Sequence, residues 1–159
     1  MDIGSHTVNY FYNSQTQRKK YKFNVPTEKK YPYTKRNLLT KTEYYFYFVL
    51  AEAFPGYVIC PKVRLEDFVQ VTTHNERGKW RGFIKSRHVD FLICDSKMNI
   101  RLGVELDDKP HDLKEPTKID TFKDNLFKQI GIPLLRVKTG TAEHYKQQLT
   151  QYVNSTKTT

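Results

Sequence analysis

The spacing of apolar and polar positions changes several times along the chain, and each change marks an expected element. Glu43 lies three residues after Thr40, and the apolar run YYFYFVLAEAF follows it directly. A hydroxyl followed at this spacing by a carboxylate is the capping box of a helix N-terminus. Pro55 and Gly56 then interrupt the pattern. The sequence therefore predicts a helix over residues 41–54.

Three shorter apolar runs are typical of β-strands, and they cover residues 57–63, 88–94 and 100–106. Only the turn sequence DSKMN separates the last two, which predicts an antiparallel hairpin. Residues 65–69 fit either a helical turn or an extension of the first strand, and residues 72–82 are predicted to form a polar loop.

The C-terminal part shows a helical repeat over residues 117–130, carried by Ile119, Phe122, Leu126 and Ile130. Gly131 follows where a C-terminal cap is expected. A strand over 133–137 and a closing helix over 141–153 complete the order, and the helical crossover sends this strand back along the sheet. The chain is thus predicted to have an α/β fold with helices packed on a mixed sheet.

Acidic residues stand inside two of the predicted strands. Because alternate side chains of a strand share a face, Glu105 and Asp107 are neighbours on one face, roughly 7 Å apart at the backbone. If Asp90 of the partner strand lies on that face, it meets Glu105 across the hairpin. A hard divalent cation is the simplest reason to tolerate such repulsion. The alternative is that these acids merely end their strands at the surface.

A third acid, Glu43, lies on the stripe of its helix that should face the sheet, where an unpaired carboxylate is costly. It can serve the capping box, support a metal site, or do both.

Positive charge is concentrated at the N-terminus. The net charge is +10, and residues 1–42 hold nine Lys or Arg against two acids, so that segment carries +7. Tyrosine and phenylalanine are interleaved with these charges, which suits phosphate neutralisation and base stacking. A solvated tail is the alternative. The candidate nucleic-acid-binding residues of this arm are Arg18, Lys19, Lys20, Lys22, Lys29, Lys30, Lys35 and Arg36.

The predicted loop adds three candidates, Lys79, Trp80 and Arg81. Trp80 could enter a groove or stack on a base, or it could simply cover the core.

The cysteines, Cys60 and Cys94, lie in apolar runs and are expected to be core residues of a protein from a reducing compartment. The first residues lack the apolar stretch of a signal peptide, and no segment approaches the length of a membrane span. We therefore expect a cytoplasmic, nucleoid-associated protein with an arm (1–37), one folded domain (38–154) and a short tail (155–159).

Several motifs occur in a characteristic order: Glu43, VDFLI around Asp90, VELDD around Glu105, His111, Asp120 and GIPLLRV. Over residues 38–138 they resemble the PD-(D/E)XK, or restriction-endonuclease-like, nuclease superfamily. Within it they are most similar to a branch of uncharacterised bacterial domains related to very-short-patch repair endonucleases. The resemblance implies an αβββαβ core and Mg²⁺- or Mn²⁺-dependent hydrolysis of phosphodiester bonds, usually in DNA. It also implies that Asp90 and Glu105 are metal ligands, with Glu43 as the supporting helix acid.

This chain departs from the superfamily motif at one position, since Asp107 stands where a lysine is expected two residues after the glutamate. Asp107 then either adds a metal ligand or leaves the positioning of water to another residue. Lys123 is one candidate for that task, because related families can carry the basic residue on the following helix. The alternative is a helix-surface lysine paired with Asp120 or Asp124.

His111 follows a Lys-Pro turn and could shuttle a proton near neutral pH, or it could be an ordinary surface histidine.

Two functions therefore stay open. The favoured one is a metal-dependent nuclease acting on nucleic acid, most simply DNA. The other is a binding module of the same fold that has lost hydrolysis and serves a larger DNA-processing or defence assembly, with a protein partner or as a homodimer.

Overall fold

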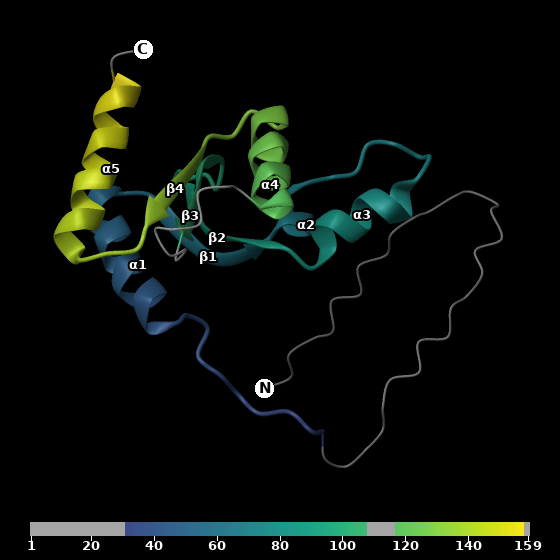
Figure 1. The fold of residues 1–159 in the computed structure, drawn as a ribbon, viewed down its shortest axis with the longest axis horizontal. Helices are drawn as coiled ribbons and strands as arrows, with labels where there is room; N and C mark the ends of the chain where they lie inside the picture. Colours follow the sequence, from purple (N-terminus) through teal and green to yellow (C-terminus); the bar gives the residue numbers. More distant parts are fainter. Residues whose placement is uncertain (1–30, 108–116, 158–159) are drawn as a thin grey trace, which may run out of the picture. The chain divides into compact units, whose positions relative to one another are not determined.

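The computed structural model describes residues 31–107 and 117–157, which Figure 1 shows as a ribbon. The chain divides into two compact units, Met1–Lys35 and Arg36–Thr159, and all the elements belong to the second. The helices are α1 (Lys41–Ala53), α2 (Leu65–Phe68), α3 (Arg77–Lys85), α4 (Lys118–Gln129) and α5 (Ala142–Lys157). The strands are β1 (Val58–Arg64), β2 (His88–Cys94), β3 (Ile100–Asp107) and β4 (Leu134–Lys138).

The strands form one sheet in the order β1-β2-β3-β4. β2 is antiparallel to both β1 and β3, whereas β4 runs parallel to β3. A parallel pair needs a crossover connection, and α4 supplies it between β3 and β4. The predicted α/β class, with its mixed sheet and its order of one helix, three strands, a helix and a strand, is confirmed.

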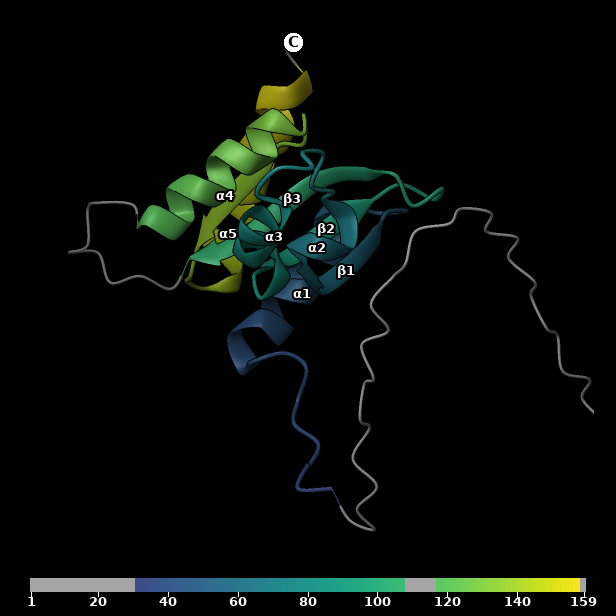
Figure 2. The same cartoon turned by 90° about the vertical axis from the view of Figure 1, so that its right-hand side faces the viewer.

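Each face of the sheet carries its own core. On one face, α1 and α5 pack together, and the ring of Phe46 lies 5.6 Å from Phe91 and 4.8 Å from Tyr145 between ring centres. On the other face, α2, α3 and α4 cover a second core of Leu65, Ile84, Val89, Leu92, Cys94 and Phe127. Figure 1 shows the two groups of helices on opposite sides of the strands, and in Figure 2 α2 and α3 lie in front of the sheet.

The segment predicted as a polar loop contains a helix instead, α3. Gly78 and Gly82 lower its intrinsic helix propensity, which is why the sequence pattern favoured a loop. The helix is stabilised by packing, because Ile84 is buried and the ring of Phe83 lies 5.7 Å from that of Phe122 on α4. The neighbouring segment 65–69, for which two structures were open, forms the short helix α2.

The helix predicted over residues 117–130 is confirmed as α4, and Gly131 ends it at a φ of +70°. The inward face of α4 is rotated from this repeat: Phe122 and Leu126 pack on the core, but Ile119 is 49% exposed and Phe127 is buried. Gly103 of β3 explains the rotation, since a Cβ there would lie 2.4 Å from the Phe127 ring. Lys123 is four residues before Phe127 and therefore shares its inward face.

The described part of α5 continues past the predicted domain boundary, to Lys157. Cys60 and Cys94 are free thiols, half-buried and buried respectively, as expected of core residues. Within residues 31–107 and 117–157, no helix is long and apolar enough to cross a membrane.

Candidate active site

The β2–β3 hairpin opens at the end that carries the acids. The paired register runs from Cys94 opposite Ile100 to Phe91 opposite Val104. Just beyond it, the backbone N–H of Leu106 donates to Asp90 Oδ2 at 3.0 Å. The side chain of Asp90 is therefore fixed by the neighbouring strand, next to the position of Glu105.

Glu105 is the most deeply buried acid of this region, with 8% of the residue exposed. Lys123 Nζ donates to Glu105 Oε1 at 2.7 Å, and the lysine side chain is only 12% exposed. Burial raises the pKa of Glu105, the hydrogen bond from Lys123 opposes the rise, and the charge of Asp90 adds to it. The structure thus brings Asp90 close enough to Glu105 for their charges to interact.

Glu43 occupies two roles at once. Its Oε2 accepts the backbone N–H of Thr40 at 2.9 Å, which completes the predicted capping box of α1. Its Oε1 accepts a hydrogen bond from Lys62 of β1. Burial favours a higher pKa for Glu43, but the hydrogen bonds from Lys62 and Thr40 outweigh burial, so the pKa is lowered. Glu43 is therefore ionised and faces the same lysine as Asp90.

Lys62 joins these acids and was missed in the sequence. Its Nζ lies 3.1 Å from Asp90 Oδ1 as well as against Glu43, and burial lowers its pKa less than the two carboxylates raise it. A signal was present, because Lys62 is the one charged residue inside the apolar run YVICPKV. The run alone could not show that the side chain points toward the acids.

His88 completes the group at the start of β2. Its Nε2 lies 3.4 Å from Lys62 Nζ and 3.7 Å from Asp90 Oδ1. Partial burial and the charge of Lys62 lower the pKa of His88, so its imidazole is neutral near pH 7 and can accept a hydrogen bond from the lysine.

The helix that carries Lys123 is tied to the sheet by Arg136 of β4. The guanidinium lies 3.3 Å from Asp120 Oδ1 and 2.9 Å from Asp124 Oδ1. The two acids considered as alternative partners of Lys123 are thus paired with Arg136, and Lys123 pairs with Glu105 instead. Arg136 was also missed, although it lies within the quoted motif GIPLLRV.

The remaining predicted site residues lie outside the described part of the chain, at its exposed start, or at the end of β3. His111 and the arm residues up to Lys30 lie outside the described residues. Lys35 and Arg36 are exposed. Asp107 ends β3, where its backbone carbonyl accepts the N–H of Thr139 at 3.0 Å.

The basic and aromatic candidates of the predicted loop lie on α3. Lys79 pairs with Glu76, and Arg81 pairs with Glu66 of α2, while Trp80 is 43% exposed and its ring lies 5.8 Å from Phe83. Trp80 therefore has a solvent-exposed surface and also contacts Phe83, so base stacking and covering of the core both stay open.

Among the described residues, no three His, Cys, Asp or Glu side chains are grouped closely enough to hold a metal ion. Asp90 and Glu105 are the pair whose charges interact, and each also has a lysine beside it. A two-carboxylate set fits Mg²⁺, which keeps several of its waters when bound to protein. Asp90 and Glu105 are thus the residues that could hold such a cation, and water or substrate oxygens would have to complete its ligands.

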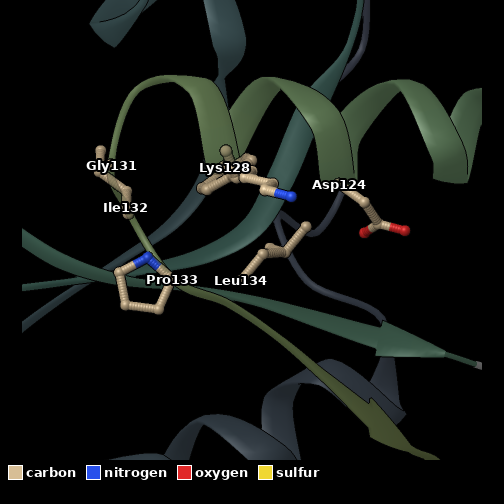
Figure 3. A pocket seen from close by; sticks show the side chains of 7 residues that line it. Asp124, Lys128, Gly131, Ile132, Pro133 and Leu134 are labelled. Carbon is tan, nitrogen blue, oxygen red and sulfur yellow. The ribbon is translucent and has the colours of Figure 1, made fainter.

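A separate hollow lies at the far end of α4, where the helix turns into β4. Figure 3 shows Asp124, Lys128, Pro133 and Leu134 around it. None of the carboxylates and lysines that surround Asp90 and Glu105 lines this hollow. The hollow is therefore separate from the acidic group of Glu43, Asp90 and Glu105.

Comparison with protein families identifies one match, over residues 35–155, to a family described as "Protein of unknown function (DUF2726)". The match covers most of the chain, which therefore belongs to this family. Comparisons with curated proteins and with solved structures found no match.

Proposed function

We propose that this member of the DUF2726 family is a metal-dependent nuclease of the PD-(D/E)XK type, which hydrolyses phosphodiester bonds in DNA. The observation that carries the proposal is the approach of Asp90 and Glu105 at the open end of a hairpin, with a lysine beside each. Paired carboxylates suit a hard cation, and ammonium groups beside them suit the phosphate that shares it.

Asp90 and Glu105 would hold Mg²⁺ or Mn²⁺. Asp107, two residues after Glu105 on β3, is the candidate third ligand. A bound cation of this kind lowers the pKa of a coordinated water and stabilises negative charge on the phosphate.

The remaining tasks fall to the protein's own side chains. Lys123 reaches the carboxylates from α4 and is the candidate to orient water and offset charge on the scissile phosphate, which a lysine at position 107 would otherwise do. Glu43 positions Lys62, and Arg136 keeps α4 against the sheet. His111 stays a candidate for proton transfer.

Substrate attraction is assigned to the basic segments. The exposed residues Arg77, Lys79, Trp80 and Arg81 on α3 combine positive charge with an aromatic surface, as does the N-terminal arm. Such surfaces bind the nucleic-acid backbone and lose affinity steeply as salt is raised.

The test is cleavage of supercoiled plasmid by the full chain with Mg²⁺ or Mn²⁺, against parallel reactions with excess EDTA. We expect nicked and linear products only with metal, and loss of these products in Glu105→Ala. Equal cleavage by the parent and Glu105→Ala would show that the proposed site is wrong, and intact plasmid over a range of substrates and metals would contradict the proposal.

A second candidate is a binding module without hydrolysis. It is favoured by Asp107 at the usual lysine position and by the lysine partners that Asp90 and Glu105 already have. In that case the full chain should retain salt-sensitive DNA binding that neither EDTA nor Glu105→Ala changes, and no product should form.

A further inference from the structure

Lys62 has a backbone conformation that is unusual for its place in the fold. Its φ is +54° in the middle of β1, in the left-handed region that a non-glycine residue rarely adopts. Strain of this kind persists where the surrounding structure holds it, and it occurs often at functional sites.

The consequence for β1 is a change of face. Cys60 and Val63, which are three residues apart, both pack against the core under α2, α3 and α4, although strict alternation would place them on opposite faces. The strand register skips Lys62 and Asp90, since it passes from Pro61 opposite Phe91 to Val63 opposite Val89. Because of this irregularity, the side chain of Lys62 does not follow the alternation of β1 and points to Glu43 and Asp90.

The ammonium group of Lys62 has two anionic partners on different elements. It binds Glu43 on α1 and lies 3.1 Å from Asp90 Oδ1 on β2, with 23% of the lysine side chain exposed. The other carboxylate oxygen of Asp90 accepts the N–H of Leu106. Both oxygens of Asp90 are therefore engaged, and a divalent cation that binds Asp90 must share or replace the contact with Lys62.

Replacement is feasible because Lys62 keeps a partner when it leaves Asp90. Glu43 is held by the backbone of Thr40 and stays in place as the second anion. Lys123 differs, since it pairs with the buried Glu105 and would leave that carboxylate behind. Lys62 is thus the lysine that can turn between the acids and a ligand without becoming an unpaired, partly buried charge.

We propose that Lys62 is a resident counterion of the Asp90 site, which weakens divalent-cation binding in the free protein and moves to the phosphate of bound nucleic acid. This inference rests on the proposed function. Since Lys62 opposes the cation only while it lies on Asp90, a phosphate that draws it away strengthens cation binding. Coupling of binding is reciprocal, so the cation must also strengthen nucleic-acid binding by the same factor.

The experiment compares Lys62→Met with the full parent chain by calorimetric titration of Mn²⁺, without DNA and then with a short DNA duplex. Without DNA, Lys62→Met should bind Mn²⁺ about fivefold more tightly, the upper end of the scale for one partly exposed ion pair. In the parent, the duplex should tighten Mn²⁺ binding by at least about fivefold, and Lys62→Met should lose most of this gain.

Two controls separate this role from a general charge effect. Lys62→Arg keeps the positive charge and should bind Mn²⁺ as the parent does. Lys128→Met removes an exposed lysine of α4 from outside the acidic group and should also match the parent. If Lys62→Met does not fold, as judged by thermal unfolding, Lys62→Gln replaces it with the same expectation.

Unchanged or weaker Mn²⁺ binding in Lys62→Met would overturn the inference, and so would absence of Mn²⁺ binding in both proteins. Plasmid cleavage by the parent, measured in parallel, tests the proposed function separately. Tighter Mn²⁺ binding in Lys62→Met without cleavage by the parent supports the counterion and rejects the nuclease. Cleavage by the parent, together with unchanged Mn²⁺ affinity in Lys62→Met, supports the nuclease and rejects the counterion.

Discussion

The two ends of the β2–β3 hairpin use the same chemical groups in opposite ways. At the turn, Asp95 accepts hydrogen bonds from the N–H groups of Lys97 and Asn99 and pairs with Arg101, all within six residues. At the open end, Asp90 and Glu105 are bound by lysines 28 and 18 residues away. The hydrogen-bond partners of Asp95 are therefore close in the sequence, whereas the lysines that pair with Asp90 and Glu105 come from distant elements.

The electrostatic result differs accordingly. Hydrogen bonds from Asn99 lower the pKa of Asp95 to about 2. Burial raises the pKa of Glu105. A carboxylate with a lowered pKa stabilises the fold, while a buried one with a raised pKa is costly to keep charged. The turn acid is therefore explained by folding alone, and the buried acid is not.

The largest difference is expected in cleavage. Asp90→Ala or Glu105→Ala should reduce plasmid cleavage by about 1000-fold or more, because each removes a proposed ligand of the cation. Asp95→Ala removes a carboxylate of the same hairpin and should cleave within about twofold of the parent at a temperature where it is folded. Initial rates of nicking measure the effect, and equal losses at both ends would show that the hairpin acts only through stability.

Lys123→Ala should come next, with a single-turnover cleavage rate reduced by about 100-fold, because the ammonium beside Glu105 is lost. Lys128→Ala, about one and a half helical turns further along α4 and exposed, is the matched control and should keep the parental rate. Retention of the parental rate in Lys123→Ala would reject its role and make Asp107 with His111 the better candidates for handling water.

Stability should depend on pH in opposite directions at the two ends. Asp95 has a lowered pKa, so its contribution is present above about pH 3.8 and is lost as the pH falls toward 2. Glu105 has a raised pKa, so the folded protein favours its protonated form and loses stability as the pH rises above 4.5.

Urea unfolding in EDTA at several pH values measures both effects. Asp95→Asn should remove part of the acid-side loss, and Glu105→Gln should remove part of the loss above pH 4.5. If Glu105→Gln has the same pH profile as the parent, Glu105 does not carry a raised pKa in the folded protein.

The smallest effect concerns two non-glycine residues at positive φ: Met98 at the hairpin turn, at +64°, and Lys62 on β1 beside the open end, at +54°. Met98→Gly should stabilise the protein by about 0.5–1 kcal/mol, because glycine adopts this conformation without a Cβ penalty. Lys62→Gly relieves the same strain but loses two ion pairs, so urea midpoints should show it to be no more stable than the parent. Stabilisation by both substitutions would mean that the ion pairs of Lys62 contribute little.

Much of the fold was predictable from local patterns. The capping box at Thr40, the hairpin around Asp95 and the glycine stop at Gly131 depend on residues within a few positions of one another. Helix α3 was not predictable, because two glycines oppose it and its stability comes from Ile84 and Phe83 packing on other elements.

The candidate site also has residues that local patterns predict and residues that only packing determines. Strand alternation was enough to predict that Glu105 points to the other face of β3 from Leu102, Val104 and Leu106. These three residues do pack on the face that α1 and α5 cover. It could not identify Lys62, whose direction depends on a left-handed residue inside a strand, nor the face of α4 that carries Lys123, which depends on Gly103 admitting the Phe127 ring.

The residue types and their spacing were therefore sufficient for the α/β order, the strand faces and the acids that could share a cation, since these follow from short-range geometry. The partners of those acids were decided by packing between elements. A pair such as Lys62 and Asp90 joins residues 28 positions apart. Ion pairs of that kind leave no periodic signal in a sequence, because they depend on how strands pair and how a helix rotates against the sheet.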